Sequence, residues 1–288
     1  MMYKMCEGGT GTAMSLLESI LYGFISGIFE FLPVSSRAHQ ALFRYLFCAD
    51  TRDSIQDLLV HIGLVLAIVI SYRELLLRLH REHKSIASRR RNVRSLDSRI
   101  YYDLRLLNTA TMPLIIGLTL CFATVKFENN LLCLLAFCIF NGVVLLIAEH
   151  TRHGNRDAKT MTGLDGIAMG LVGALSAFTG ISRTGMISAY SLARGADSKH
   201  AANWAVLLGI PALLFAIFFD VFVILRSGVG VISYYTILQC FLSGISAFCG
   251  GYISITILQM ALNHFGFSGF AYYSIGTGLF SFILYLIT

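Results

Sequence analysis

Two short polar segments, far apart in the chain, interrupt otherwise apolar stretches and carry residues that could do chemistry. The first, residues 30–39, reads EFLPVSSRAH, and the second, residues 177–185, reads AFTGISRTG. The separation that aligns Phe31 with Phe178 also aligns Ser35 with Ser182. In a membrane protein, polar breaks at corresponding places in two halves indicate a binding site at the interface between repeats.

The first segment has the residue types of an activated nucleophile. Pro33 breaks the apolar stretch, and Ser35 or Ser36 is a good N-cap for a following helix, whose free N–H groups favour a phosphate. His39 lies three residues after Ser36 and four after Ser35, so it can share their helix face. A hydroxyl beside an imidazole is a minimal nucleophile arrangement. Glu30 can orient His39, hold a divalent cation or act as a base.

The second segment predicts a phosphate clamp. Ser182 and Thr184 flank Arg183 at another capped helix start, and a guanidinium matches phosphate oxygens with a planar fork of donors. Together the two segments predict a phosphate-binding set made of Ser35, Ser36, Ser182, Arg183 and Thr184.

Each residue also has a plainer interpretation. Glu30 can be a buried, protonated acid, His39 a packed neutral histidine, and Arg183 a structural counter-ion to Glu30. Any one of the hydroxyl residues can simply cap a helix. For Arg37 we expect the side chain to extend to the membrane interface. The joint occurrence of these residues in two matched breaks favours a functional site, because an ionisable residue within a membrane is a functional hypothesis by default.

The composition predicts that these segments lie in a membrane protein. The chain is 56% hydrophobic and 13% charged, with a mean hydropathy of +0.71, whereas soluble domains carry roughly 25% charged residues. Six apolar runs approach the ~20 residues that span a bilayer, and two further apolar regions, 14–46 and 163–194, contain the polar breaks. The six predicted spans are 56–76, 107–125, 131–148, 203–225, 233–258 and 267–287.

Charge predicts the orientation. The stretch Arg73–Arg105 holds ten Lys and Arg residues against four acids, which is typical of a cytoplasmic segment that contacts anionic lipid heads. We expect no nucleic-acid partner, because no aromatic residues alternate with the arginines. If each broken region enters the membrane and returns on the same side, both termini lie outside.

The predicted fold is therefore an all-α, polytopic membrane protein. Its single domain, 1–288, contains two inverted repeats, each a re-entrant helix pair followed by three transmembrane helices. We place repeat 1 at about 14–150, repeat 2 at about 160–288 and the basic cytoplasmic loop at about 78–105. Non-helical backbone is tolerated at membrane depth only where protein or a water-filled cavity satisfies it. The two broken segments should therefore meet inside the protein.

At this point the chain resembles a known family, the undecaprenyl-diphosphate phosphatases, also called the bacitracin-resistance proteins. The segment Ser19–His39, with its Glu-Phe-Leu-Pro-Val-Ser-Ser run, is similar to the first signature of that family. The segment Gly180–Gly185 is similar to the second, an arginine-bearing loop. The resemblance covers nearly the whole chain, since the length, the order of spans and the internal repeat also agree.

The resemblance implies a multi-pass phosphohydrolase of the bacterial plasma membrane, with its site near the outer face. Such an enzyme removes the terminal phosphate of undecaprenyl diphosphate and so recycles the lipid carrier of cell-wall synthesis. It depends on a divalent cation, Mg²⁺ or Ca²⁺. By position, Glu30 matches the second glutamate of a paired-acid motif and is the implied metal ligand. Ser36 matches the proposed nucleophile, His39 the motif histidine and Arg183 the phosphate-binding arginine.

One departure from the family pattern keeps other functions open. Ser26 stands where the family has the first acid of its pair, and losing a general base typically lowers a rate by ~10²–10⁴-fold. The alternatives are a non-hydrolytic polyprenyl-phosphate transporter or flippase, in which Arg183 binds phosphate without chemistry, and an inactive lipid-binding homologue. The expected partners are a polyprenyl diphosphate lipid and the bilayer, and the sequence leaves open a homo-oligomer.

Overall fold

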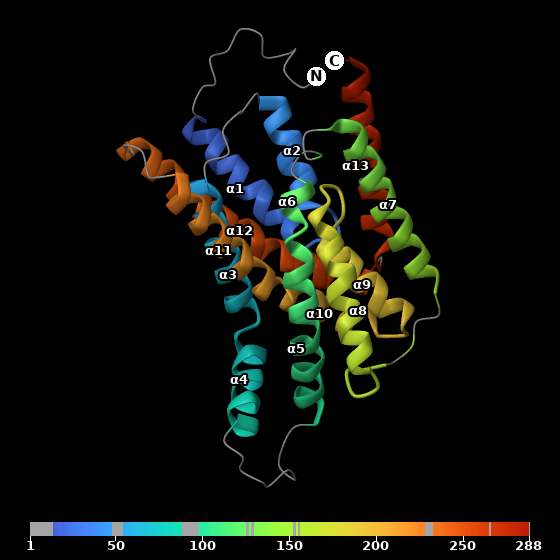
Figure 1. Cartoon of the computed structure of the whole chain (residues 1–288). Helices are drawn as coiled ribbons and strands as arrows, with labels where there is room; N and C mark the ends of the chain where they lie inside the picture. The colour runs from blue at the N-terminus through green and yellow to red at the C-terminus, as the bar shows by residue number, and fades with distance from the viewer. Residues whose placement is uncertain are drawn as a thin grey trace.

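The computed structural model describes residues 14–47, 54–87, 98–124, 127, 130–151, 154, 156–227, 233–264 and 266–287, and their regular structure is helical (Figure 1). A 3₁₀ turn, η4 (Leu175–Ala177), continues the eighth helix. The helices are α1 (Leu16–Glu30), α2 (Ser36–Phe47), α3 (Ser54–Ser71), α4 (Arg73–Ala87), α5 (Ser98–Leu118), α6 (Cys121–Thr124), α7 (Leu131–His150), α8 (Gly163–Ala174), α9 (Arg183–Ala193), α10 (Ser198–Leu207), α11 (Gly209–Ser227), α12 (Tyr234–His264) and α13 (Ser268–Ile287).

Five helical stretches in the described part are long and apolar enough to cross a bilayer, which makes the chain a multi-pass, all-α membrane protein. They are Ser54–Ser71, Leu131–His150, Ser198–Arg226, Tyr234–His264 and Ser268–Ile287. They correspond to five of the six predicted spans.

The sixth predicted span, 107–125, has wrong boundaries. Its helix, α5, begins earlier, at Ser98, and ends at Leu118, and the short α6 follows after a turn. The beginning of α5 is charged, and the indole Nε1 of Trp204 donates a hydrogen bond to Asp103 at 2.9 Å. This hydrogen bond from a distant helix stabilises the charged first turns of α5, and the sequence does not reveal it.

The order and pairing of the helices repeat in the two halves of the chain. The series α1, α2, α3, α5 and α7 corresponds to α8, α9, α10–α11, α12 and α13. In the packing, α1 lies along α12 while α8 lies along α5, and α7 pairs with α13 as α3 pairs with α11 (Figure 1). These four pairings agree with the predicted repeat, whereas α3 also packs closely along α12 and its counterparts α11 and α5 make only a small contact. The repeat and its inversion across the bilayer therefore stay predictions.

Small residues let the exchanged pairs approach closely. A Cβ atom on Gly23 or Gly27 of α1 would collide with backbone carbonyls of α12. A Cβ atom on Gly166 or Gly170 of α8 would crowd carbonyls of α5 in the same way. Small residues at such spacing are typical of helix pairs in membranes, where close backbone packing replaces the hydrophobic driving force.

The basic stretch forms two helical arms at one end of the bundle. Helix α4 and the beginning of α5 extend away from the other helices, opposite the beginning of α1 and the end of α13 (Figure 1). The predicted basic loop, 78–105, is therefore helical at both described edges, whereas residues 88–97 lie outside the described part of the chain.

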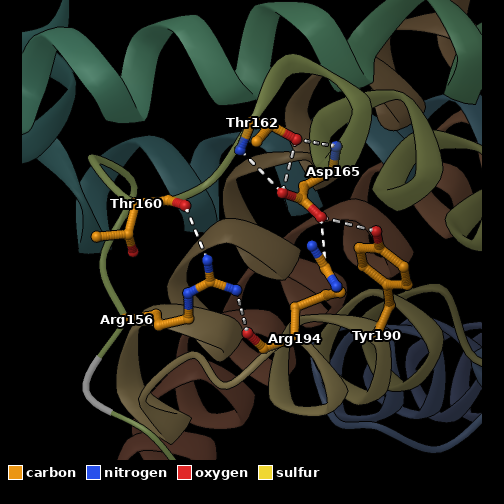
Figure 2. Close-up of polar contacts among 6 residues, drawn as sticks. All are labelled: Arg156, Thr160, Thr162, Asp165, Tyr190 and Arg194. Atoms are coloured by element: carbon orange, nitrogen blue, oxygen red, sulfur yellow. Dashed lines mark hydrogen bonds and ion pairs between the residues drawn. The ribbon is translucent and has the colours of Figure 1, made fainter.

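The two broken helix pairs begin with matching capping boxes. Ser15 and Glu18 cap α1, and Thr162 and Asp165 cap α8 at the corresponding positions of the second repeat. Among the described residues, the second box alone has further side-chain partners: the Asp165 carboxylate accepts hydrogen bonds from the Tyr190 hydroxyl at 3.1 Å and from Arg194 Nε at 2.6 Å (Figure 2). These two hydrogen bonds connect the beginning of α8 to the end of α9.

Neighbouring residues extend this polar cluster. Arg156 donates hydrogen bonds to the carbonyl oxygens of Arg194 and Thr160 at 3.0 and 3.3 Å (Figure 2). Burial of Asp165 disfavours its charge, but hydrogen bonds from Thr162 and Arg194 outweigh that effect and lower the pKa of the carboxyl. The ionised carboxylate therefore stabilises the fold above its unfolded pKa of about 4, and this contribution falls as the pH drops toward the folded pKa.

Asp165→Asn is expected to lower the free energy of unfolding by about 2 kcal/mol, because hydrogen bonds to a buried charged group are strong. Glu18→Gln is the matched control, since it changes the same capping position in the repeat that lacks the arginine tie. It should cost no more than about 1 kcal/mol, the usual value of a cap. Thermal unfolding in detergent measures both variants, and equal losses would contradict a stabilising role for the contact with Arg194.

Candidate functional site

The two polar breaks meet in the interior of the protein. Glu30 ends α1 and Arg183 begins α9, and their atoms Oε1 and Nη2 lie 3.1 Å apart. The Thr184 hydroxyl donates to the Glu30 carbonyl at 3.4 Å, and the Gly180 N–H donates to Ser35 Oγ at 3.1 Å. The prediction that the two broken segments lie together inside the protein is therefore confirmed.

A side chain from a third helix joins the two segments. Asn141 of α7 is fully buried and donates from Nδ2 to the Pro33 carbonyl at 3.1 Å, while its Oδ1 accepts from the Ser182 N–H at 2.9 Å. Gly180 adopts a positive φ of 117°, a conformation that favours glycine, where the second segment turns. Protein groups thus satisfy the irregular backbone, as a low-dielectric environment requires.

A cavity of about 240 Å³ lies at this junction. Glu30, Ser36 and Arg183 line it, together with residues of α2, α3, α5, α6 and α11. Six charged side chains reach its wall, three basic and three acidic: Arg37, Arg44, Arg183, Glu30, Asp57 and Asp220.

Ser36 and Glu30 form a close pair in this cavity. The Ser36 hydroxyl donates to Glu30 Oε2 at 2.6 Å, a distance typical of a charge-assisted hydrogen bond between oxygens. The acceptor of the serine proton is therefore a carboxylate, where the sequence had predicted an imidazole. A carboxylate in contact with a hydroxyl can act as its general base.

Arg183 presents buried donors without hydrogen bonds. Its side chain is only 9% exposed, and Nε and Nη2 form no hydrogen bond of good geometry with the described residues, although Nη2 contacts Glu30. Gly209 makes room for the guanidinium, because a Cβ atom there would lie 2.8 Å from Nη2. Buried donors of this kind require a partner, and an anion in the cavity would supply one.

Ser36 and Arg183 occupy the same position in the two repeats. Each is the first residue of its helix, directly after the serine of the matched pair, and the separation that aligns Ser35 with Ser182 aligns them as well. The two aligned helix starts lie near each other, and one carries a hydroxyl while the other carries a guanidinium.

The expectation for Arg37 is wrong, because its side chain does not extend to the interface. Nη1 donates to the Ala177 carbonyl at 2.9 Å and contacts the Ser176 carbonyl at 3.4 Å. The helix ending before the second break leaves carbonyls without helical partners, and Arg37 from the first repeat satisfies them.

His39 lies away from the cavity, so the predicted pairing of His39 with Ser36 is wrong. Its ring nitrogens contact the Ser35 carbonyl at 2.7 Å and the Tyr273 hydroxyl at 2.9 Å. The imidazole also stacks on Phe29, with ring centroids 3.6 Å apart. Both nitrogens are engaged in an aromatic groove on another side of α2, which agrees with the packed-histidine interpretation.

Of the five predicted phosphate ligands, three have other roles in the structure. Ser35 Oγ accepts from the Ala38 N–H at 3.3 Å, and Ser182 Oγ accepts from the Gly185 N–H at 3.1 Å, so both cap helices. Thr184 is fully buried and bonds the Glu30 carbonyl. Ser36 and Arg183 are the two whose functional groups combine access to the cavity with suitable chemistry.

Sequence reasoning missed several residues of the cavity wall. Gln40 and Arg44 share a face of α2 with Arg37, at helical spacing that could have revealed them. Asp57 and His61 are four residues apart on α3, and Asp220 is an acid within an apolar stretch, which by itself signals function. Their convergence required the tertiary structure, because α3 and α11 are distant in the chain.

The residues present do not form a ready-made metal centre. Within the described ranges, no group of three or more His, Cys, Asp or Glu side chains is placed to hold an ion. The two oxygens of Glu30, the predicted metal ligand, contact Arg183 and Ser36. Mg²⁺ is often bound by one or two carboxylates together with substrate phosphates, so these residues would need phosphate oxygens to complete its coordination.

Ser26, which stands where the family has the first acid of its pair, is buried and faces away from solvent. Ser26 has no exposed surface, and its hydroxyl donates to the Tyr22 carbonyl at 2.7 Å. The same oxygen accepts from Gln40 Nε2 at 2.9 Å, and Gln40 lines the cavity. Ser26 is therefore linked to the cavity wall through its hydrogen bond with Gln40.

The fold and the cavity define a class: a polytopic membrane protein with a charged, partly apolar cavity where two broken helical segments meet. Residues 19–280 match the family described as bacitracin resistance protein BacA, and the chain belongs to that family.

Curated relatives agree with this assignment. A protein of Treponema denticola named undecaprenyl-diphosphatase is 29% identical over 92% of this chain and 96% of its own length. A protein of Alkaliphilus metalliredigens with the same name is 29% identical over 91% and 95%. Undecaprenyl-diphosphatase 1 of Shouchella clausii is 29% identical over 70% and 72%.

Proposed function

We propose that this protein hydrolyses undecaprenyl diphosphate to undecaprenyl phosphate in the bacterial plasma membrane and so recycles the lipid carrier of cell-wall synthesis. The observation that carries the proposal is the convergence of the Ser36–Glu30 pair and Arg183 on one cavity. Membership of the family and the names of the curated relatives support the same activity.

Binding of the diphosphate would move the Arg183 guanidinium from the Glu30 carboxylate to a phosphate group. Without substrate, the Glu30 carboxylate stands in for a phosphate oxygen against Nη2. A phosphate in the cavity competes for the guanidinium with more charge and more oxygens. As Arg183 turns to the phosphate, the Glu30 carboxylate is released from its counter-ion, while the Ser36 hydroxyl still donates to it. Substrate binding would thus leave this carboxylate available to accept the serine proton.

The reaction proceeds in two displacements. Ser36 Oγ bonds to the terminal phosphorus as the bond to the bridging oxygen breaks, and its proton passes to Glu30 Oε2. Lipid monophosphate leaves with the bridging oxygen. Water then attacks the phosphorus, inorganic phosphate departs, and Glu30 returns its proton to Ser36 Oγ. Arg183 stabilises the charge on the phosphoryl oxygens in both steps.

The cavity would face the outer side of the membrane. Its lining comes from the beginning of α3, the end of α5 and the middle of α11, away from α4 and the basic arms (Figure 1). The positive-inside rule places those arms in the cytoplasm. A divalent cation, Mg²⁺ or Ca²⁺, remains part of the proposal as a species that arrives with the diphosphate, and no step is assigned to it.

Phosphate release from purified protein in detergent tests the proposal. With undecaprenyl diphosphate as substrate, we expect catalytic release of phosphate, and assays with chelator and with added Mg²⁺ measure the cation requirement. A folded protein that forms no phosphate in either condition would contradict hydrolysis.

The exchanged helix pairings favour one second candidate, a polyprenyl-phosphate transporter, because internal repeats around a central site suit alternating access. Movement of labelled lipid phosphate between the leaflets of reconstituted vesicles, without phosphate release, would support it instead.

A further inference from the structure

The cavity contains an imidazole, but it is that of His61 and not that of His39. His61 of α3 lines the cavity wall, and its Nδ1 lies 2.7 Å from Oδ2 of Asp220 on α11. The His61 side chain is 24% exposed and that of Asp220 is 11% exposed. Within the described residues, Nε2 has no hydrogen-bond partner, so this nitrogen can meet a molecule that enters the cavity.

The carboxylate fixes the protonation pattern of this imidazole. The Asp220 carboxylate accepts a hydrogen bond from Nδ1–H, so Nε2 is an acceptor whenever the ring is neutral. A histidine oriented by a carboxylate on one side, with the other nitrogen available, is the arrangement of a general base. His39 cannot act in this way, because both of its nitrogens are engaged in the groove next to Tyr273.

The proposed two-step reaction needs a second base. After the first displacement, Glu30 holds the serine proton and must return it to Ser36 Oγ, so it cannot also accept a proton from water. The other acids of the cavity already have donors: Asp57 accepts from the Tyr22 hydroxyl at 2.8 Å, and Asp220 accepts from His61. Among the described residues of the wall, His61 remains as a base with a ring nitrogen open to the cavity.

We propose that His61, oriented by Asp220, accepts the proton of the water molecule that hydrolyses the phosphoester on Ser36. The inference rests on the proposed function. The new bond joins the water oxygen to phosphorus, the Ser36 Oγ–phosphorus bond breaks, and the water proton goes to Nε2 and then to solvent. His61 is thus a catalytic residue, and Asp220 is a positioning residue.

Rapid-quench kinetics with His61→Gln test this role. The expected result is a fall in steady-state phosphate release by roughly 10²–10⁴-fold. Lipid monophosphate should still form in an initial burst, and mass spectrometry should detect phosphoryl Ser36. His80→Gln, a change at an exposed position on α4, is the control. Unchanged phosphate release in His61→Gln, or loss of the burst together with steady-state turnover, would overturn the inference.

Two further variants keep the test independent of folding. Added imidazole should restore part of the turnover of His61→Ala, because it replaces the lost base; a folded variant that imidazole leaves unchanged would count against the inference. Asp220→Asn should also accumulate phosphoenzyme, since an amide that donates to Nδ1 places the ring proton on Nε2.

The outcomes for the two proposals are distinguishable. Inactive wild-type protein would overturn the proposed function and with it this inference. Full turnover in Ser36→Ala would overturn the phosphoserine intermediate, and with it this inference, but not the hydrolytic function. Active wild-type protein whose His61→Gln variant is equally active would overturn only the role of His61.

Discussion

Replacing Arg183 with alanine is expected to lower lipid-diphosphate turnover by roughly 10²–10³-fold or more, the usual effect of removing a group that stabilises developing charge. The buried Nε and Nη2 atoms, which make no hydrogen bond of good geometry with the described residues, would be lost. Glu30 would keep its hydrogen bond from Ser36 but lose its cationic partner. Steady-state phosphate release measures the effect.

A lysine at position 183 tests the positive charge of the side chain separately from the planar geometry of the guanidinium. Arg183→Lys retains a point charge but lacks the planar fork, so we expect turnover between that of the wild type and that of the alanine variant. Arg78→Ala on the exposed face of α4 is the control, because it removes a guanidinium remote from the cavity. Full activity in a folded Arg183→Ala variant would rule out the clamp.

Ser36→Ala is expected to abolish turnover, with a loss of roughly 10⁴-fold or more, as for other serine nucleophiles. The variant removes the atom that attacks phosphorus and leaves Arg183 in place, so the substrate should still bind. Phosphate release and mass spectrometry of the quenched enzyme measure the two consequences, lost turnover and absent phosphoenzyme.

The neighbouring serine provides a matched comparison. Ser35→Ala removes an acceptor of the Ala38 and Gly180 N–H groups, and loss of a cap costs about 1 kcal/mol. Its main effect should be lower thermal stability, with a much smaller loss of turnover than in Ser36→Ala. The opposite ranking of the two variants would show that Ser35 performs the chemistry.

The matched breaks explain why sequence reasoning reached the centre of the site. Ser36 and Arg183 follow directly after the two aligned serines, so the repeat and the need to satisfy broken backbone inside a membrane were sufficient to place them together. The same reasoning misassigned His39. A shared helix face is a local property, and the direction of an imidazole depends on its neighbours, here Phe29 and Tyr273.

The parts that sequence reasoning missed come from other helices. His61 and Asp220 belong to α3 and α11, which become neighbours only through the packing of the two repeats. The contacts of Arg37 likewise depend on packing between segments that are distant in the chain. An arginine in an apolar region can reach the interface or an interior carbonyl, and the open end of the α8–η4 helix, which lies beside it only in the folded protein, selects the second.

The amino-acid sequence by itself determined that the chain crosses a membrane and that a hydroxyl and a guanidinium begin two helices with matching sequences, and it predicted two related halves. Those properties follow from composition, length of apolar runs and local helix chemistry, which require no knowledge of distant contacts. The tertiary structure decided which base faces Ser36, which histidine enters the cavity and which hydroxyls serve only as caps. Each of these choices depends on the direction of a side chain relative to residues far away in the chain, and close packing of the helices fixes that direction.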